Sequence, residues 1–141
     1  MKDGERRMRE LIQAAKAASR VFDQLFAEAV EPLGLPAVQA EVVLLLYEKG
    51  PLTATVLSEL IQVRPGNLTR IIDKLALEGW VERRTNPEDL RRAHILLTST
   101  GEDTACQIQR LQQPILDWGR EVVGERELLR ATDALRRLVD R

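Results

Sequence analysis

The stretch from residue 64 to residue 75, RPGNLTRIIDKL, decides the fold. Pro65 suits the first position of a helix, because the N–H group that it lacks would have no partner there. Apolar residues then recur at intervals of three or four positions, at Leu68, Ile71, Ile72 and Leu75. This spacing predicts a helix from Pro65 to Leu77 or Glu78 with one buried face, and Gly79 suits its C-terminal cap.

Two further helices are expected before this stretch. Apolar residues at helical spacing predict one over residues 36–49, which Gly50-Pro51 ends. Thr53 then precedes a short helix over 54–61, for which Val56, Leu57, Leu60 and Ile61 form the expected buried face. A turn over 62–64 joins the short helix to the helix that begins at Pro65.

After Gly79 the period changes from helical to extended. Residues 80–84 and 92–97 are expected as strands, joined by a polar loop over 85–90. Helix, short helix, turn, helix and hairpin follow in the order of a winged helix-turn-helix. The expected fold class is therefore mainly α with a small two-stranded β-wing.

The two ends of the chain are expected to be long amphipathic helices. Apolar residues recur at spacings of three and four over 5–31 and again from about residue 99, where Pro114 predicts a kink or a break before a final helix over 125–139. These apolar faces lie outside the winged part and would be exposed in a monomer. We expect one unit, 1–141, with a winged helix-turn-helix reading part for DNA over 36–98. The flanks, 5–31 and 99–141, are expected to form a homodimer. The alternative is a helical bundle within one chain.

Charge is segregated along the chain. The whole chain has a formal net charge of −1, yet residues 64–92 hold seven basic and five acidic residues and so carry +2. Nucleic-acid affinity would therefore come from one face of the molecule.

The candidate DNA contacts follow from side-chain chemistry. On the helix after residue 64, the residues off the apolar stripe suit the major groove of DNA. Asn pairs with adenine and Arg with guanine, and Gly66 permits close approach of the backbone. Arg70 and Lys74 suit contacts to phosphates. In the hairpin, arginines suit the minor groove. The alternatives are a solvated helix face and strand-edge charge that discourages aggregation. The candidates are Arg64, Pro65, Gly66, Asn67, Thr69, Arg70, Lys74, Arg84, Asp89, Arg91 and Arg92.

Several motifs together resemble the MarR family of regulators. They are Leu57-Ser58-Glu59-Leu60, the stretch 64–75, Glu78-Gly79-Trp80-Val81-Glu82-Arg83, Asp89-Leu90-Arg91, and Leu97-Thr98 followed by Gly101. The resemblance implies a repressor that binds a pseudo-palindromic operator in double-stranded DNA as a homodimer, with Arg91 in the minor groove and Asp89 bracing it. It also implies a small aromatic effector that releases the DNA. Leu90 stands where the family often has arginine, and Arg64 where a small capping residue is common.

Other functions find little support in the sequence. The only histidine, His94, and the only cysteine, Cys106, lie in no active-site motif, so we expect no enzyme, metal or cofactor. Cys106 is expected as a small buried residue without a redox role. No membrane-length apolar run appears, and a cytoplasmic location is expected. The main rival function is a winged-helix module that binds protein and no DNA.

Overall fold

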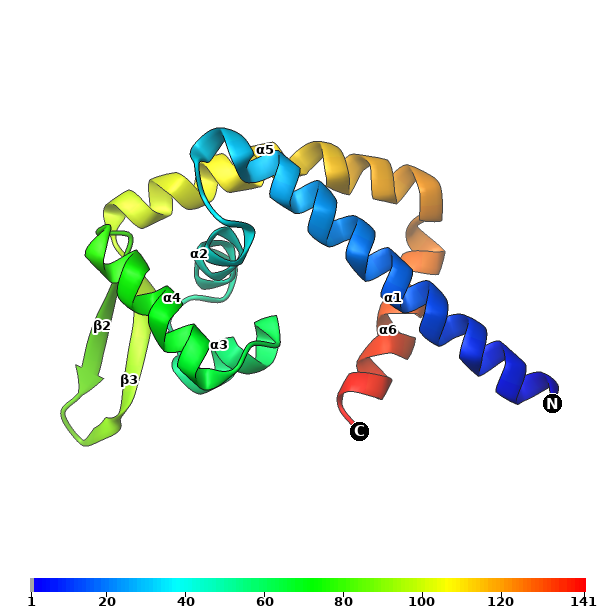
Figure 1. The fold of residues 1–141 in the computed structure, drawn as a ribbon, viewed down its shortest axis with the longest axis horizontal. Coiled ribbons are helices and arrows are strands. Elements are labelled where there is room, and N and C mark those ends of the chain that lie inside the picture. The colour runs from blue at the N-terminus through cyan, green and yellow to red at the C-terminus, as the bar shows by residue number, and fades with distance from the viewer. Residues whose placement is uncertain (1) are drawn as a thin grey trace.

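The computed structural model describes the backbone of residues 2–141, and the side chains of these residues except Asn86, Asp89, Leu90 and Arg91. Figure 1 shows the elements in their spatial arrangement. In chain order they are α1 (Asp3–Val30), the 3-10 turn η1 (Glu31–Leu33), α2 (Ala37–Lys49), β1 (Leu52–Thr53), α3 (Ala54–Ile61), α4 (Pro65–Leu77), β2 (Val81–Asn86), β3 (Asp89–Leu97), α5 (Ser99–Val123) and α6 (Glu125–Val139).

The elements form a compact reading unit and a flanking set of long helices. α2, α3 and α4 pack together, and the β2–β3 hairpin projects from them (Figure 1). α1 and α5 pack against each other and against α2, while α6 turns back from the end of α5. The N-terminal part of α1 extends beyond the rest of the molecule. The reading unit thus contacts the long helices mainly through α2.

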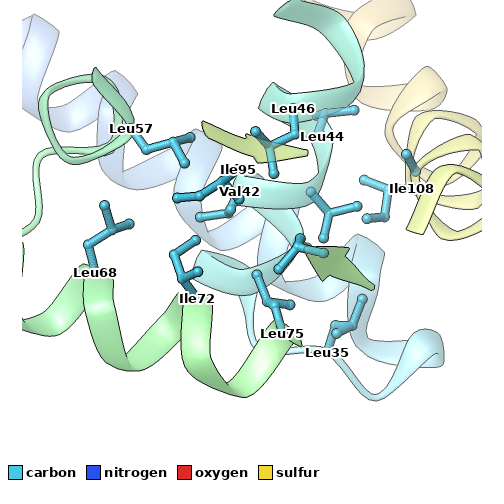
Figure 2. Close-up of a cluster of buried hydrophobic side chains, with 14 of the residues drawn as sticks. Leu35, Val42, Leu44, Leu46, Leu57, Leu68, Ile72, Leu75, Ile95 and Ile108 are labelled. Carbon is cyan, nitrogen blue, oxygen red and sulfur yellow. The ribbon is translucent and has the colours of Figure 1, made fainter. Parts of the chain in front are cut away.

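The core lies where α2, α4 and the sheet meet (Figure 2). Three of the four residues predicted on the apolar stripe of α4, Leu68, Ile72 and Leu75, are buried, and the fourth, Ile71, is partly buried against the same core. The predicted face of α3 was wrong in part. Leu57 is buried, but Val56 and Leu60 are 39% and 43% exposed, because so short a helix turns only a narrow strip toward the core.

Local hydrogen bonds set the ends of α3 and α4. Thr53 Oγ1 accepts the N–H of Val56 at 3.3 Å and so caps α3. α3 ends at Gln62, which has a left-handed backbone (φ 57°) and reverses the chain toward α4. At the other end of α4, Gly79 (φ 82°) donates its N–H to Ala76 O and Trp80 donates to Leu75 O. This is the Schellman arrangement, and it confirms Gly79 as the capping glycine.

The sheet has three strands in the order β1-β3-β2, all antiparallel, so the expected two-stranded wing gains a strand. β1 pairs Leu52 with Ile95. Two residues are too few to show a period of two, so sequence pattern could not reveal β1. The expected loop over 85–90 is also shorter, because β2 and β3 extend to a turn at Pro87 and Glu88. Polar residues in a projecting ribbon still pair through their backbones.

The start of α5 is fastened to the root of the wing. Thr98 donates its backbone N–H to Trp80 O at 3.1 Å, and its hydroxyl donates to Gly79 O at 2.6 Å. The same hydroxyl oxygen accepts the N–H of Gly101 and caps α5. α5 then runs without interruption past Pro114, so the predicted break is absent, and the helix arcs along its length in Figure 1.

The long helices leave much apolar surface uncovered. Val30 is the only buried residue of α1, and none of α6 is buried. Large apolar side chains are exposed on α1 at Met8, Leu11, Ile12, Val21 and Phe22, on α5 at Leu116, Trp118 and Val122, and on α6 at Leu129, Leu135, Leu138 and Val139. Over the described residues, no single helix is long and apolar enough to cross a membrane; α1 with η1 passes such a test only jointly with α2, across a 90° bend.

Cys106 differs from its expected place. It is partly exposed, and its thiol donates a hydrogen bond to Tyr47 Oη at 3.4 Å. The contact with the Cys106 side chain, through hydrogen bonding between the two groups and then through charge, raises the pKa of the Tyr47 hydroxyl. The prediction of a buried cysteine was wrong because Cys106 lies beside the buried stripe of α5, next to Ala105, rather than on it.

Candidate nucleic-acid interface

The outward face of α4 carries the predicted polar residues. The side chains of Leu68, Ile72 and Leu75 of α4 are buried in the core, which leaves the opposite face for solvent or DNA. All seven candidates of this region are exposed: Arg64, Pro65, Gly66, Asn67, Thr69, Arg70 and Lys74. They occupy the N-terminal end and one side of a helix of the size that fits the major groove.

The N-terminus of α4 has unfilled hydrogen-bonding capacity. The Arg64 side chain does not cap the helix, as expected where it replaces a small capping residue. The backbone N–H groups of Gly66 and Asn67 therefore remain available at the positive end of the helix dipole. Such an end favours an anion such as a DNA phosphate.

The individual side chains of α4 differ in their freedom. Thr69 Oγ1 donates to Pro65 O at 3.0 Å, so its hydroxyl oxygen is left to accept and its methyl group to make apolar contact. Within the described part of the chain, neither Arg70 nor Lys74 forms an ion pair. Both cations are therefore available to phosphates.

An ion pair links the wing to α4. Arg83 Nη2 of β2 lies 2.5 Å from Asp73 Oδ1 of α4. Both side chains are partly exposed, so the pair contributes little stability, but it sets the wing root relative to α4. The contact joins residues ten positions apart, so a sequence pattern could not reveal it. Arg83 was not among the candidate contacts.

The remaining wing candidates have mixed outcomes. Arg84 is exposed, and its Nη2 lies 3.2 Å from Glu82 Oε1, which offsets part of its charge. Arg92 is exposed on β3. The side chains of Asp89 and Arg91 lie outside the described residues, although the backbone pairing Asn86↔Asp89 places Asp89 at the start of β3. The roles given to Asp89 and Arg91 stay predictions.

A cavity of about 610 Å³ lies between the reading unit and the long helices. Its lining comes from α1, α2, α5 and the start of α6. The sequence named no effector-binding residue, because these side chains come from four segments that only the fold brings together. Among the described residues, no group of three or more His, Cys, Asp or Glu is placed to hold a metal ion.

Comparison with known proteins agrees with this geometry. The model of the MarR family matches residues 35–93. The multiple antibiotic resistance protein MarR of Escherichia coli K12 is 35% identical over 63% of this chain, and the aligned segment spans 62% of that relative. The protein of the same name from Salmonella typhimurium is 35% identical over 71% of this chain and 68% of its own length.

A solved structure extends the similarity over nearly the whole chain. A mutant MarR from E. coli, crystallised in complex with operator DNA, is 26% identical and has a TM-score of 0.74. The match covers 97% of this chain and 99% of the other. The match therefore spans the helix-turn-helix, the wing and the flanking helices, and the chain belongs to the MarR family.

Proposed function

We propose that this protein is a sequence-specific DNA-binding transcriptional regulator, a repressor that a small-molecule effector releases. The observation that carries the proposal is the division of α4, whose Leu68, Ile72 and Leu75 are buried in the core while its polar side chains form an exposed face next to the wing. The MarR of E. coli, which shares this fold, has been crystallised with operator DNA. The curated relatives are regulators of transcription, which supports a function other than an enzyme's.

The proposed active form is a homodimer made by the flanks, 5–31 and 99–141, with 36–98 as the reading part. α6 has no buried residue and α1 has one, so both helices expose apolar faces that a second chain would cover. A two-fold dimer presents two copies of α4 to half-sites about 34–36 Å apart, which suits a pseudo-palindromic operator. The proposed compartment is the cytoplasm.

The proposed DNA contacts are of two kinds: contacts to phosphates position the protein, and contacts to bases give sequence specificity. Arg70 and Lys74 are proposed to hold phosphates, Asn67 and Thr69 to read base edges, and the wing arginines, Arg91 first, to enter the minor groove. Arg64 and the N-terminus of α4 would add phosphate contacts. Arg84, Arg92 and the brace Asp89 complete the proposed wing.

Binding to duplex DNA as a function of salt tests the proposal. Fluorescence anisotropy should show that log K falls linearly with log salt, and Arg70→Ala should reduce the slope by about 1 without changing sequence preference. Asn67→Ala should instead relax the preference that in vitro selection reveals. Lys2→Ala, at the N-terminus ahead of the proposed dimer flank and far from α4 (Figure 1), is the matched control and should leave both unchanged.

The rival function, a winged-helix module that binds protein alone, gives a different result. It predicts no duplex binding at low salt, or binding that survives Arg70→Ala combined with Arg91→Ala. Sedimentation of the same preparation reports on the dimer: a monomer at micromolar concentration would contradict the proposed assembly.

A further inference from the structure

The cavity between the reading unit and the long helices has the size of a small-molecule site. Its volume, about 610 Å³, lies within the range of ligand sites, about 300–1,000 Å³. Most of its wall is apolar, with aromatic rings from α1 and aliphatic side chains from α2 and α5. Representative lining residues are Phe22, Phe26, Leu45, Ile115 and Leu116.

The charges on the cavity wall are of one predominant sign. Asp23, Glu41 and Glu48 supply three carboxylates, and Arg120 is the one cation among the described lining residues. Arg120 Nη2 lies 3.5 Å from Glu125 Oε1, a carboxylate that does not line the cavity. The cavity therefore presents an excess of negative charge that its own arginine does not balance.

The three carboxylates also lack partners of their own. Within the described part of the chain, none of Asp23, Glu41 and Glu48 forms an ion pair or a side-chain hydrogen bond. Partial burial, and then the nearby charge of Asp23, raise the pKa of Glu41. A cation in the cavity would offset both effects by favouring the charged form of Glu41, whereas an anion would strengthen the repulsion.

The aromatic wall adds a second preference for a cation. Phe22 lines the cavity and packs edge-to-face on Trp118 with ring centroids 6.5 Å apart. The faces of Phe22 and Phe26 can accept a positive charge through their ring quadrupoles, which attract cations and repel anions. Shape, wall polarity and charge thus agree on one chemical class.

We propose that this cavity binds a lipophilic organic cation, a molecule with an apolar, aromatic body and a single positive charge. This differs from the negatively charged phenolates and carboxylates that a small aromatic effector would include, because such anions would meet three carboxylates. Binding of the cation does not depend on DNA binding, whereas a role of the cation in releasing DNA rests on the proposed function.

Two probes of matched size and opposite charge test whether the cavity prefers a cation to an anion. Tetraphenylphosphonium is a permanent cation and tetraphenylborate an anion of nearly the same shape. Isothermal titration of the protein should show saturable binding of the cation that is at least about 10-fold tighter than that of the anion, since three carboxylates and one arginine line the cavity. Equal or tighter binding of the anion overturns the proposal.

Charge-removing variants locate the site. Glu41→Gln and Asp23→Asn should each weaken binding of tetraphenylphosphonium about 3- to 10-fold, and Arg120→Met should strengthen it. Glu121→Gln, on α5 but outside the lining, is the matched control and should leave the affinity unchanged. Loss of affinity in the control equal to that in Glu41→Gln would show attraction by the overall charge of the protein and would overturn the assignment.

A second copy of the chain is the competing occupant. If the partner's helices fill the cavity in the dimer, neither probe binds, or binding weakens as protein concentration rises; either result overturns the proposal. DNA affinity measured in parallel separates the two claims. Cation binding without DNA binding contradicts the proposed function alone, and DNA binding without cation binding contradicts the ligand assignment alone.

Discussion

Gly101→Ala tests how tightly α5 is fastened to the wing root. A Cβ atom at this position would lie 2.1 Å from Trp80 O and 3.1 Å from Leu97 Cδ2, where ordinary contact begins at 3.4 Å. The obstacle is a backbone carbonyl, so the backbone itself must move by about 1 Å. That carbonyl also accepts the N–H of Thr98, so the shift strains the junction.

The expected magnitude follows from opposing terms. Overpacking costs about 1–3 kcal/mol, and weakening the Thr98 hydrogen bond costs about 0.5–1.5 kcal/mol. Alanine recovers about 0.8–1 kcal/mol through its better helix propensity. The net loss is about 1–3 kcal/mol, which lowers Tm by roughly 4–10 °C for a chain of this size.

Thermal unfolding followed by circular dichroism, at one fixed protein concentration, measures this loss. Gly119→Ala in the same helix is the matched control, because a Cβ there meets nothing within 4 Å. It should raise stability by up to about 1 kcal/mol. A Gly101→Ala protein as stable as the parent would refute the close approach of α5 to Trp80.

Three further predictions concern single contacts. Thr98→Val removes the hydroxyl that bonds Gly79 O and the N–H of Gly101, and should cost about 0.5–2 kcal/mol in urea unfolding, while Thr98→Ser retains most of it. A double-mutant cycle of Asp73→Asn and Arg83→Ala should give a coupling of only about 0.2–1 kcal/mol, since both partners are exposed; coupling above about 2 kcal/mol would contradict this. Glu41→Gln should raise the free energy of unfolding by a few tenths of a kcal/mol at pH 7. Because the pKa of Glu41 is raised in the folded state, protonated Glu41 favours folding below pH 4.5, and this contribution is lost as the pH rises through the folded-state pKa. The difference in free energy of unfolding between the variant and the parent should therefore vanish near pH 4.

The sequence alone determined the elements whose signals are local. The helix from Pro65 to Leu77 was predictable because an apolar stripe, a proline at the first position and a capping glycine all lie within fifteen residues. The polar face of α4 followed by elimination, since residues off the stripe must point away from the core. The long flanking helices were predictable for the same reason.

The tertiary structure decided what depends on contacts between distant segments. β1, the Asp73–Arg83 pair and the approach of Gly101 to Trp80 join residues ten or more positions apart, and periodicity carries no information about such partners. The same holds for the cavity, whose carboxylates come from α1 and α2 and whose arginine comes from α5. Periodicity reports which side of each helix is buried, while the sign of charge inside a cavity depends on which helices meet there.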